Sequence, residues 1–405
     1  MKTNRKKEPA IRKVKEIEVS KQHLVLRIVL LVVFIMLALF FFGYFIIQFL
    51  NPEEGWTLVE SDSSYANTSS IIDFYYDFDK VSIADKKEIK RLYTEASVNA
   101  FRIFDEKNAY DNYNNINTLN THPNEIIEVD KALYKALKII NDSSSRFMYY
   151  EPMFIYIESV ANSENDSDAK TYDSKYSNEV KEYYEKLSAY VSDPSKINIE
   201  LFDDYKVRLN VSSDYLELRE DEGIDCFIGL CELGQIFMID YLSDVFLSHG
   251  YLNCYFVDKE GSFRTLSNEE MNVPISKFDG NEISLISTLT LNKKTSFVGL
   301  KSYPISDSSY PYYIYGDKTI TNGFIDSNGI QKTSIDSLYS YDSNLSCAEV
   351  ALKILDIYIS DTFNAQRLKD TNLKYIYSLD NKIYYNDYGV LSNINDEYQG
   401  VYVND

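Results

Sequence analysis

The sequence predicts an α+β domain of helices and mostly antiparallel strands, preceded by a single transmembrane helix. Three observations lead to this prediction. One uncharged apolar run is long enough to cross a bilayer, and several later segments repeat apolar residues at the helical spacing of 3.6. Between them lie short runs rich in aromatic and β-branched residues, bounded by Asn, Gly, Ser and Pro, as strands usually are. Because the two kinds of segment are mixed along the chain, α+β is the class that they favour.

The apolar run is Ile28–Leu50, which contains no charged residue and a single amide, Gln48. At about 1.5 Å per residue it would span roughly 35 Å, enough to cross the hydrocarbon core. A cleaved signal peptide is the alternative, but its apolar region is usually about 7–15 residues long and ends at a small-x-small site. Phe49-Leu50-Asn51-Pro52 offers no such site. We therefore expect a permanent transmembrane helix.

Charge sets the expected orientation. Residues 1–50 carry nine Lys and Arg against three Glu, a net charge of +6, which leaves −27 for the rest of the chain. By the positive-inside rule the basic tail 1–27 stays in the cytoplasm. We expect a single-pass protein of the cell membrane with a span at 28–50, a polar tether at 51–73 and an extracytoplasmic domain at 74–405. Such an acidic domain without a basic stripe excludes nucleic acid as a partner.

The domain's elements follow in chain order. Phe74–Ile83 has the composition of a strand, and a helix that Asp85 can cap comes next, with an apolar stripe that ends at Phe104. Asp105–Asn120 is expected to be a loop, and a second helix to start at Asp130. The later expectations are an exposed insertion at Ser159–Lys175, a hairpin at Val207–Leu218, a strand at Leu252–Val257, short strands within 262–320, a helix at Cys347–Ile359 and a closing hairpin at 373–385.

Two features of the composition limit the chemistry. The four cysteines, Cys226, Cys231, Cys254 and Cys347, all follow the span, where disulfides can form, but their spacing does not pair them. Without a CxxC motif, and with only two histidines in this part, a zinc site is improbable. Glycine is scarce at 14 of 405 residues. A backbone cradle for phosphates needs glycines at the point of closest approach, so such a cradle is hard to build here.

Several motifs in order resemble one family. Ala100-Phe-Arg-Ile-Phe-Asp105, Asn115-Ile-Asn-Thr-Leu-Asn120, Ile127-Glu-Val-Asp130, Ser145-Arg-Phe147, Phe324-Ile-Asp-Ser-Asn-Gly329 and Asn344–Leu355 are similar to successive motifs of the FAD:protein FMN transferase (ApbE) family. That family consists of extracytoplasmic flavin-handling proteins held at the bacterial membrane. The resemblance covers roughly residues 74–390 and implies an ApbE-like domain, related to the T-fold.

The stretch Ile228–Gly250 resembles the family's catalytic turn and helix, but it lacks the family's working residues. Asp240 and Gly250 match the family's Asp and closing Gly. Cys231-Glu232 stands where the family has Gly-Gly, and Gln235 stands where it has lysine. The family's histidine before Ile-Ile-Asp aligns with Gly323. The resemblance therefore implies a transferase that has lost efficient catalysis.

The resemblance also implies which residues would contact ligands. FAD would be contacted by Asn120, Asp240, Asp326 and Gly329, and Mg²⁺ by Glu349, whose carboxylate can ligate a hard cation. Lys353 stands where the family has a metal-binding Thr, four residues after Glu349, and an ion pair between the two would compete with Mg²⁺. Structural roles are the alternatives: a capping box for Ser346 and Glu349, a buried hydrogen-bonded carboxylate for Asp240, a turn for Asp326 to Gly329, and packed thiols or a local disulfide for Cys226 and Cys231.

Three functions agree with these patterns. The first is a catalytically degenerate ApbE-like protein that serves at the membrane as a flavin- or partner-binding module, with a flavin-carrying membrane electron-transfer protein as a candidate partner. The second is an active Mg-dependent FAD:protein FMN transferase whose missing groups come from elsewhere in the chain. The third is a surface structural or adhesin-like domain without flavin. The sequence favours the first.

Overall fold

A computed structural model describes residues 55–62, 72–79, 81–278, 282–306 and 311–404, together with helical residues between Val29 and Leu37. The chain divides into two compact units, Met1–Glu53 and Glu54–Asp405. The basic tail 1–27 and most of the predicted membrane segment 28–50 lie outside the described residues. No helix in the described part is both long and apolar enough to span a membrane.

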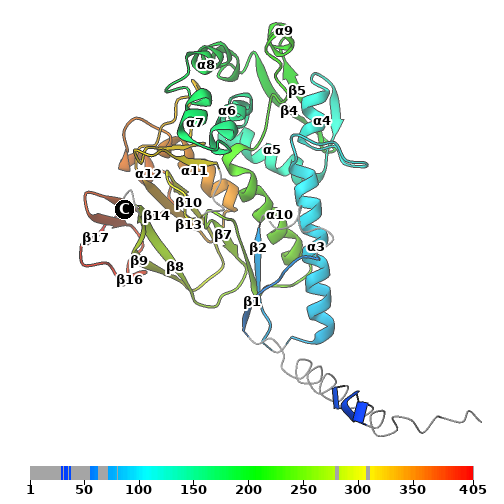
Figure 1. The fold of residues 1–405 in the computed structure, drawn as a ribbon, viewed down its shortest axis with the longest axis vertical. Coiled ribbons are helices and arrows are strands. Elements are labelled where there is room, and N and C mark those ends of the chain that lie inside the picture. Colours follow the sequence, from blue (N-terminus) through cyan, green and yellow to red (C-terminus); the bar gives the residue numbers. More distant parts are fainter. Residues whose placement is uncertain are drawn as a thin grey trace, which may run out of the picture. The chain divides into compact units, whose positions relative to one another are not determined.

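A large sheet forms the centre of the unit Glu54–Asp405 (Figure 1). Its neighbouring strands are antiparallel, except for the last pair, which is parallel. This arrangement confirms the expectation of mostly antiparallel strands in an α+β domain. The strands occur in the order β1 (Trp56–Leu58), β2 (Asp73–Asp77), β6 (Cys254–Val257), β7 (Phe263–Thr265), β10 (Thr295–Lys301), β13 (Ser337–Asp342), β14 (Lys374–Leu379), β15 (Lys382–Tyr385) and β17 (Gln399–Tyr402).

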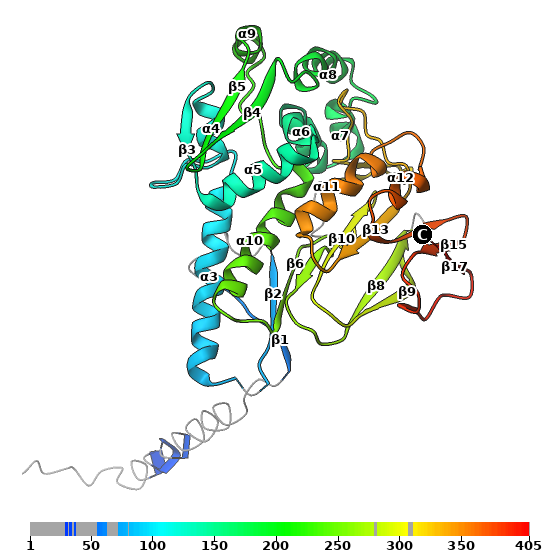
Figure 2. The same cartoon turned by 180° about the vertical axis from the view of Figure 1, so that it is seen from behind.

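Each face of this sheet is covered by a different layer. Helices α3 (Ile83–Phe104), α10 (Gly234–Ser248) and α11 (Cys347–Tyr358) lie on one face, and a small sheet of β16 (Leu391–Ser392), β9 (Ile283–Leu291) and β8 (Met271–Phe278) lies on the other (Figures 1 and 2). Strand β10 is buried along its whole length. Side chains alternate between the two faces along a strand. Val298 therefore packs in the core between the sheet and the helices, and Phe297 packs in the core between the sheet and strands β8 and β9.

A second group of elements lies beyond the large sheet, at the top of Figure 1. It contains a three-stranded sheet in the order β3, β5, β4, with helices packed around it. Its strands are β3 (Ile126–Glu128), β5 (Lys206–Val211) and β4 (Ile197–Phe202), and its helices are α4 (Ile116–Thr121), α5 (Lys131–Ser143), α6 (Glu151–Ala161), α7 (Asp166–Tyr172), α8 (Asn178–Val191) and α9 (Ser213–Glu222). The remaining described elements of this unit are the hairpin of β11 (Tyr312–Ile314) and β12 (Ile320–Asn322), the short α12 (Ala365–Lys369), and the 3₁₀ helices Phe147–Tyr150 and Cys231–Leu233.

Several predicted elements are confirmed. Helix α5 follows Asp130, whose side chain caps it, and buries an apolar stripe of Leu133, Ala136, Leu137 and Ile140. Helix α11 and strand β6 lie where they were expected. The closing hairpin forms as an antiparallel pair of β14 and β15. In each of these cases a strong local pattern agrees with the burial that the fold imposes.

The predicted hairpin at Val207–Leu218 is wrong. Strand β5 ends at Val211 and pairs with β4 and β3, and α9 starts directly after Ser212. The polar residues between Asn210 and Asp214 therefore begin a helix instead of a turn. Ser212 takes the extended N-cap conformation, and Asp214 stands in the first turn, where the helix dipole favours an acid.

Three polar segments are more ordered than predicted. β1 lies inside the predicted tether 51–73, and its Trp56 ring packs on Tyr255 at 5.3 Å. The predicted insertion Ser159–Lys175 contains α7, which Asn165 caps. The predicted loop Asp105–Asn120 contains the start of α4, with a capping box at Asn115. In each case polar or aromatic side chains find partners that a pattern of hydrophobicity does not reveal.

Two details at the start of the domain differ from expectation as well. The strand expected at Phe74–Ile83 is the shorter β2, which ends at Asp77. The helix that follows is capped by Ser82, whose side chain accepts from the Asp85 N–H. Asp85 therefore stands in the first turn and does not cap the helix.

Candidate functional site

A cavity of about 360 Å³ opens at the start of α10, and Gln235 lies in its wall. Its walls come from the end of α3 and the loop after it, from α6, and from the turn that leads into α10. The lining mixes apolar side chains with several acids. The residues are Phe101, Phe104, Asp105, Glu106, Lys107, Asn108, Glu151, Phe154, Glu158, Leu230, Cys231, Glu232, Gly234, Gln235, Met238 and Pro311.

Gln235 takes the position at which the family resemblance places lysine. Its Oε1 accepts a long hydrogen bond of 3.4 Å from the Lys259 backbone N–H. A neutral amide supplies neither a positive charge nor a titratable proton to a group bound in the cavity. Gln235 therefore helps to hold the backbone at Lys259. It does not bring the positive charge that the family's lysine would bring.

The turn before α10 fills the space that glycines would leave open. Cys231 stands at φ 46°, in the left-handed region that favours glycine. The Glu232 side chain folds against Gly323, where an added Cβ would lie 1.5 Å from Glu232 Oε1. In the same way, Glu151 lies against Gly229, with 2.0 Å between Oε2 and an added Cβ. Two glycine backbones thus accommodate the carboxyl groups of Glu151 and Glu232.

Three glutamates in this cavity carry raised pKa values. Burial, followed by the nearby Glu151, raises the pKa of Glu106 to about 8. Burial also raises the pKa of Glu151, although the Cys231 thiol, which donates to its Oε2 at 3.2 Å, opposes that shift. The pKa of Glu232 is raised well above its ordinary value by burial and by Glu260. Lys107 opposes the shifts of Glu106 and Glu151, but burial outweighs it.

The four cysteines are free thiols. Burial, followed by the charge of Glu151, raises the pKa of Cys226 to about 12, and the same two causes raise that of Cys231 well above its ordinary value. The thiolate is the nucleophile, so thiols with such raised pKa values are poor nucleophiles. Cys226 and Cys231 are therefore packed thiols, and the local disulfide considered from the sequence is not formed.

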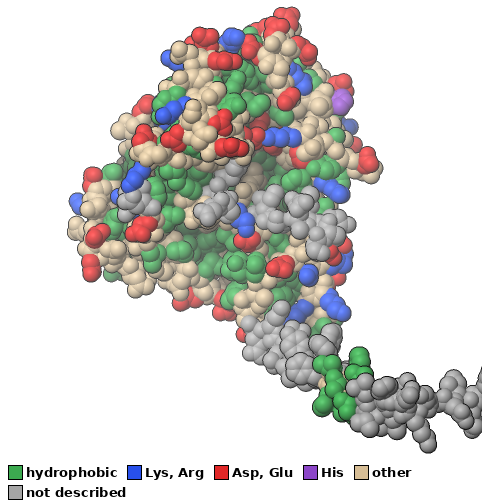
Figure 3. Space-filling model, in the orientation of Figure 1, with side chains coloured by type: hydrophobic (Ala, Val, Ile, Leu, Met, Phe, Trp, Pro, Cys, Tyr) green, Lys and Arg blue, Asp and Glu red, His purple; other side chains and the backbone are tan. Residues whose placement is uncertain are grey.

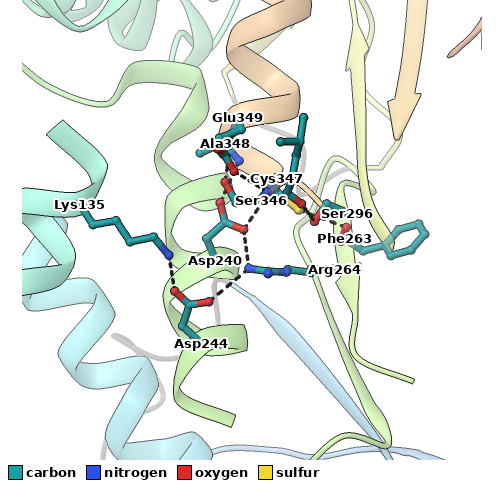
Figure 4. Close-up of polar contacts among 11 residues, drawn as sticks. Lys135, Asp240, Asp244, Phe263, Arg264, Ser296, Ser346, Cys347, Ala348 and Glu349 are labelled. Atoms are coloured by element: carbon teal, nitrogen blue, oxygen red, sulfur yellow. Dashed lines mark hydrogen bonds and ion pairs between the residues drawn. The ribbon is translucent and has the colours of Figure 1, made fainter. Parts of the chain in front are cut away.

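Asp240, which the resemblance assigns to FAD binding, lies at the centre of a network of polar contacts (Figure 4). Its carboxylate accepts from the backbone N–H groups of Cys347 and Ala348, at 2.9 and 2.8 Å, and contacts Arg264 at 3.2 Å. It therefore serves as an acceptor for the first turn of α11, where the helix dipole also favours an anion. Burial raises its pKa, and Arg264 and the two N–H groups oppose the shift. The expected buried, hydrogen-bonded carboxylate is confirmed.

Glu349, which the resemblance assigns to Mg²⁺, belongs to a capping box at the start of α11 (Figure 4). Its Oε2 accepts from the Ser346 N–H at 2.8 Å, and the Ser346 hydroxyl accepts from the Glu349 N–H at 3.2 Å. The capping box predicted from the sequence is thus confirmed. The expected ion pair with Lys353 is not among the ion pairs of the described residues, because the Glu349 carboxylate turns back toward the helix start.

Asn120 fastens the chain that enters the turn before α10. Its Oδ1 accepts from the N–H groups of Phe227 and Ile228 at 2.9 and 3.0 Å, and its Nδ2 donates to the Ile228 carbonyl at 2.8 Å. The side chain is fully buried. Asn120 therefore positions the backbone of the site through the core and lies outside the cavity lining.

Asp326 and Gly329 form a turn. The Asp326 side chain accepts from the N–H groups of Asn328 and Ile330, at 2.8 and 3.2 Å. Gly329 stands at φ 70°, and an added Cβ would lie 2.2 Å from the Tyr184 ring, so only glycine fits there. The predicted turn is confirmed. The turn packs against α8 and does not line the cavity at Gln235.

The predicted site residues therefore lie in four places. Gln235 is in the cavity wall, Asp240 and Glu349 meet at the start of α11, and Asn120 and the turn Asp326 to Gly329 are apart from both. A role in cofactor binding stays a prediction for each. Sequence reasoning missed two carboxylates of the cavity, Glu106 and Glu151. The signal for Glu151 was available, because it is the one acid in an apolar run from Phe147 to Ile157.

The residues present do not fit the ligands that the resemblance implies. A diphosphate needs backbone N–H groups at close approach and positive charge around them, but the cavity offers Glu151 and Glu232. For Mg²⁺, the described residues contain no group of three or more ligating side chains that could hold a metal ion. No step of catalysis is therefore assigned to FAD or Mg²⁺ here.

Comparisons with known proteins agree with the fold. No model of a protein family matches this chain, and no curated protein matches it. Among solved structures, the flavin transferase ApbE from Vibrio cholerae is similar, with a TM-score of 0.51 and 11% sequence identity over 78% of this chain and 93% of that one. A mutant of the same protein gives a TM-score of 0.47 with 13% identity over 78% and 93% of the two chains. The apo form of the flavinyl transferase ApbE from Pseudomonas stutzeri gives 0.43 with 9% identity over 76% and 87%. The first similarity shows that this chain has the ApbE fold, as its motifs predicted.

Proposed function

We propose that this protein is a binding module built on the ApbE fold, which has lost efficient FMN transfer and acts at the outer face of the cell membrane. The solved relatives are described as flavin transferases. What sets this chain apart is the start of α10, where Cys231, Glu232 and Gln235 take the places of two glycines and a lysine. Since function resides in the site and not in the fold, the altered site decides the proposal.

The observation that carries the proposal is the acidic cavity. Transfer of FMN from FAD would require a diphosphate to be held beside the reacting oxygens, with positive charge to offset its own. Glu106, Glu151 and Glu232 line the cavity, and Lys107 is the one basic side chain in its described lining. None of these acids, ionised or protonated, supplies the positive charge that a bound diphosphate needs.

The membrane part of the proposal rests on the sequence. The uncharged run Ile28–Leu50 and the basic residues before it favour a single span with the main domain outside. The acidic side chains scattered over the face in Figure 3 fit a domain in the extracytoplasmic space, where a membrane protein is a candidate partner. FAD and Mg²⁺ enter as ligands of the family, and the residues of this cavity argue against both.

Covalent transfer provides the test. The full chain, purified in detergent, would be incubated with FAD, Mg²⁺ and a flavin acceptor domain, and the acceptor examined by in-gel flavin fluorescence. The Vibrio cholerae transferase in a parallel reaction shows that the acceptor is competent. We expect no covalent flavin from this chain. A fluorescent acceptor above the enzyme-free background would overturn the proposal in favour of an active Mg-dependent transferase.

A further inference from the structure

A groove of about 560 Å³ lies between the large sheet and strands β8 and β9, on the sheet face opposite to the helices. Hydrophobic side chains gather in Figure 3 between the places that β8 and β2 take in Figure 1. None of the residues that line the groove lines the cavity at Gln235. They are Tyr75, Tyr255, Val257, Gly261, Phe263, Met271, Asn272, Val273, Pro274, Ser276, Ile283, Leu285, Phe297, Lys301, Ile305 and Tyr339.

The lining is mostly apolar and aromatic, with a few polar groups, as is usual for a small-molecule site of roughly 300–1,000 Å³. The rings of Tyr75 and Tyr255 stack with their centres 4.7 Å apart. Ile283 and Leu285 on β9 are 41% and 51% exposed. Apolar surface left open beside a groove is typical of a place that a ligand covers.

Lys301 is the only charged side chain in this lining, which contains no Asp or Glu. The whole chain has 62 acids against 41 Lys and Arg, so a lining without an acid is unusual for this protein. Lys301 is 4% exposed. Its Nζ lies 2.9 Å from the position of an added Cβ at Gly299 and 3.9 Å from one at Gly261. The two glycines therefore leave the space that the buried ammonium occupies.

This ammonium has few partners in the described part of the chain. One of its three N–H groups donates to the Glu260 carbonyl at 2.5 Å, and Nζ lies 5.2 Å from the centre of the Tyr339 ring. Among the ion pairs of the described residues, none includes Lys301.

Asp258 does not neutralise Lys301 fully. Burial raises the pKa of Asp258 to about 7, although hydrogen bonding from Ser262 and the charge of Lys301 oppose the shift. Its Oδ1 accepts from the N–H groups of Glu260 and Ser262 at 2.9 and 2.8 Å. At neutral pH this carboxyl is therefore only partly ionised, and it is turned to its own loop.

We propose that this groove binds a small organic acid, whose apolar body lies on the aromatic lining and whose carboxylate pairs with the Lys301 ammonium. Such a ligand brings negative charge to a buried cation and acceptors to its remaining N–H groups. A cationic ligand would meet Lys301 with the same sign, and a wholly apolar one would offer the ammonium no acceptor. The site is independent of the flavin chemistry discussed above.

Titration calorimetry of the full chain in phosphatidylcholine nanodiscs tests the proposal, with empty nanodiscs as the blank. The probes are 2-naphthoate, an aromatic acid, and octanoate, an aliphatic one. Each is compared with the alcohol of the same body, 2-naphthalenemethanol or 1-octanol. We expect saturable binding of at least one acid, and an affinity about tenfold higher than that of its alcohol, the scale of one hydrogen-bonded charge.

Three variants locate the binding. Lys301→Met removes the charge, keeps most of the methylene stem and should weaken binding of the acid by about tenfold without changing that of the alcohol. Leu285→Asp adds an acid at the exposed rim of the groove and should weaken binding of the acid by about threefold. Lys293→Met removes an exposed lysine outside the groove and should leave the affinity unchanged.

Tighter binding of naphthoate assigns the site to aromatic acids and tighter binding of octanoate to aliphatic ones, and both results support the inference. No binding of either acid, equal affinity for an acid and its alcohol, or unchanged affinity in a folded Lys301→Met variant would overturn it. If that variant does not fold, unchanged affinity in Leu285→Asp overturns it instead. The transfer assay is a separate readout, so a failure here leaves the proposed function standing.

Discussion

Two groups of carboxylates lie on helix α10 and around its start, and they differ in their partners. Near its middle, Asp240 and Asp244 share Arg264, and Asp244 also pairs with Lys135 at 2.5 Å (Figure 4). At its start, Glu232 and its neighbour Glu151 have no ion pair in the part of the chain that the structure describes. A buried carboxylate whose oxygens are all satisfied has a complete structural explanation. Glu151 and Glu232 accept fewer contacts and form no ion pair among the described residues, and burial raises the pKa of both.

The largest effect is expected from breaking the satisfied group. Asp240→Ala removes the acceptor of two α11 N–H groups and leaves Arg264, whose side chain is 19% exposed, beside Asp244 alone. Removing one partner of a buried ion pair typically costs about 3–5 kcal/mol, so we expect a loss of that size in the free energy of unfolding, measured by urea denaturation.

Asp244→Asn provides the matched control for Asp240→Ala. Asp244 also contacts Arg264, at 3.4 Å, but its side chain is 41% exposed. Water can therefore replace its contacts, and the loss should stay below about 1 kcal/mol. Similar losses in the two variants would contradict the assignment of Asp240 as a central tertiary contact.

A smaller effect of opposite sign, a gain in the free energy of unfolding, is expected for a variant of Glu106, a third acid in the cavity at the start of α10. The pKa of Glu106 is about 8 in the folded chain, against an ordinary value of 4.5. Between those two pH values the folded state holds a proton that the unfolded state has lost, so stability falls as pH rises through this window and is lowest above pH 8. Glu106→Gln has no carboxyl to titrate, so this variant does not lose stability as the pH rises through this window. Because the side chain retains some solvent contact, which screens the charge, we expect a gain of about 1–2 kcal/mol at pH 8 to 9.

Urea denaturation between pH 4 and pH 9 measures the difference between Glu106→Gln and the natural chain. The two curves should meet near pH 4, where the carboxyl is protonated in both states, and separate as the pH rises. Glu185→Gln, which changes an exposed acid, should follow the natural chain throughout. A constant offset for Glu106→Gln over the whole range would show that the effect has another origin than the charge.

The smallest effect concerns the cap beside Asp240. Ser346→Ala removes the hydroxyl that accepts from the Glu349 N–H, and loss of an N-cap side chain typically costs about 1 kcal/mol. We expect that decrease in thermal denaturation experiments evaluated at the midpoint. Ser346→Asp, which keeps an acceptor at the cap, should lose much less. A loss as large as that of Asp240→Ala would mean that the cap and the buried carboxylate act as one unit.

Local patterns predicted the elements that depend on neighbouring residues. The stripe of α5, the capping box of α11 and the turn at Asp326 all involve contacts within about four residues, which a sequence displays directly. The hairpin expected at Val207–Leu218 failed because β5 pairs with β4, which ends at Phe202, and with the distant β3. Alternation alone does not choose between such partners.

The site was predicted only in part, for the same reason. The order of motifs placed Gln235 at the start of α10 and drew attention to Cys231 and Glu232. Glu106 and Glu151 come from segments at least 80 positions earlier in the chain, and no local pattern connects them with this turn. Their approach to Glu232 is a consequence of how α6 and the loop after α3 pack.

The sequence by itself determined the acidic charge, the long apolar run, the helices with strong stripes and the missing lysine and glycines, because these are properties of single residues or of near neighbours. The tertiary structure alone decided which carboxylates are satisfied. Asp240 and Glu151 are both buried acids, but only Asp240 meets an arginine and the first turn of a helix. Whether a charge has a partner depends on segments far apart in the chain, and that pairing determines how far the cost of burying an acid is offset.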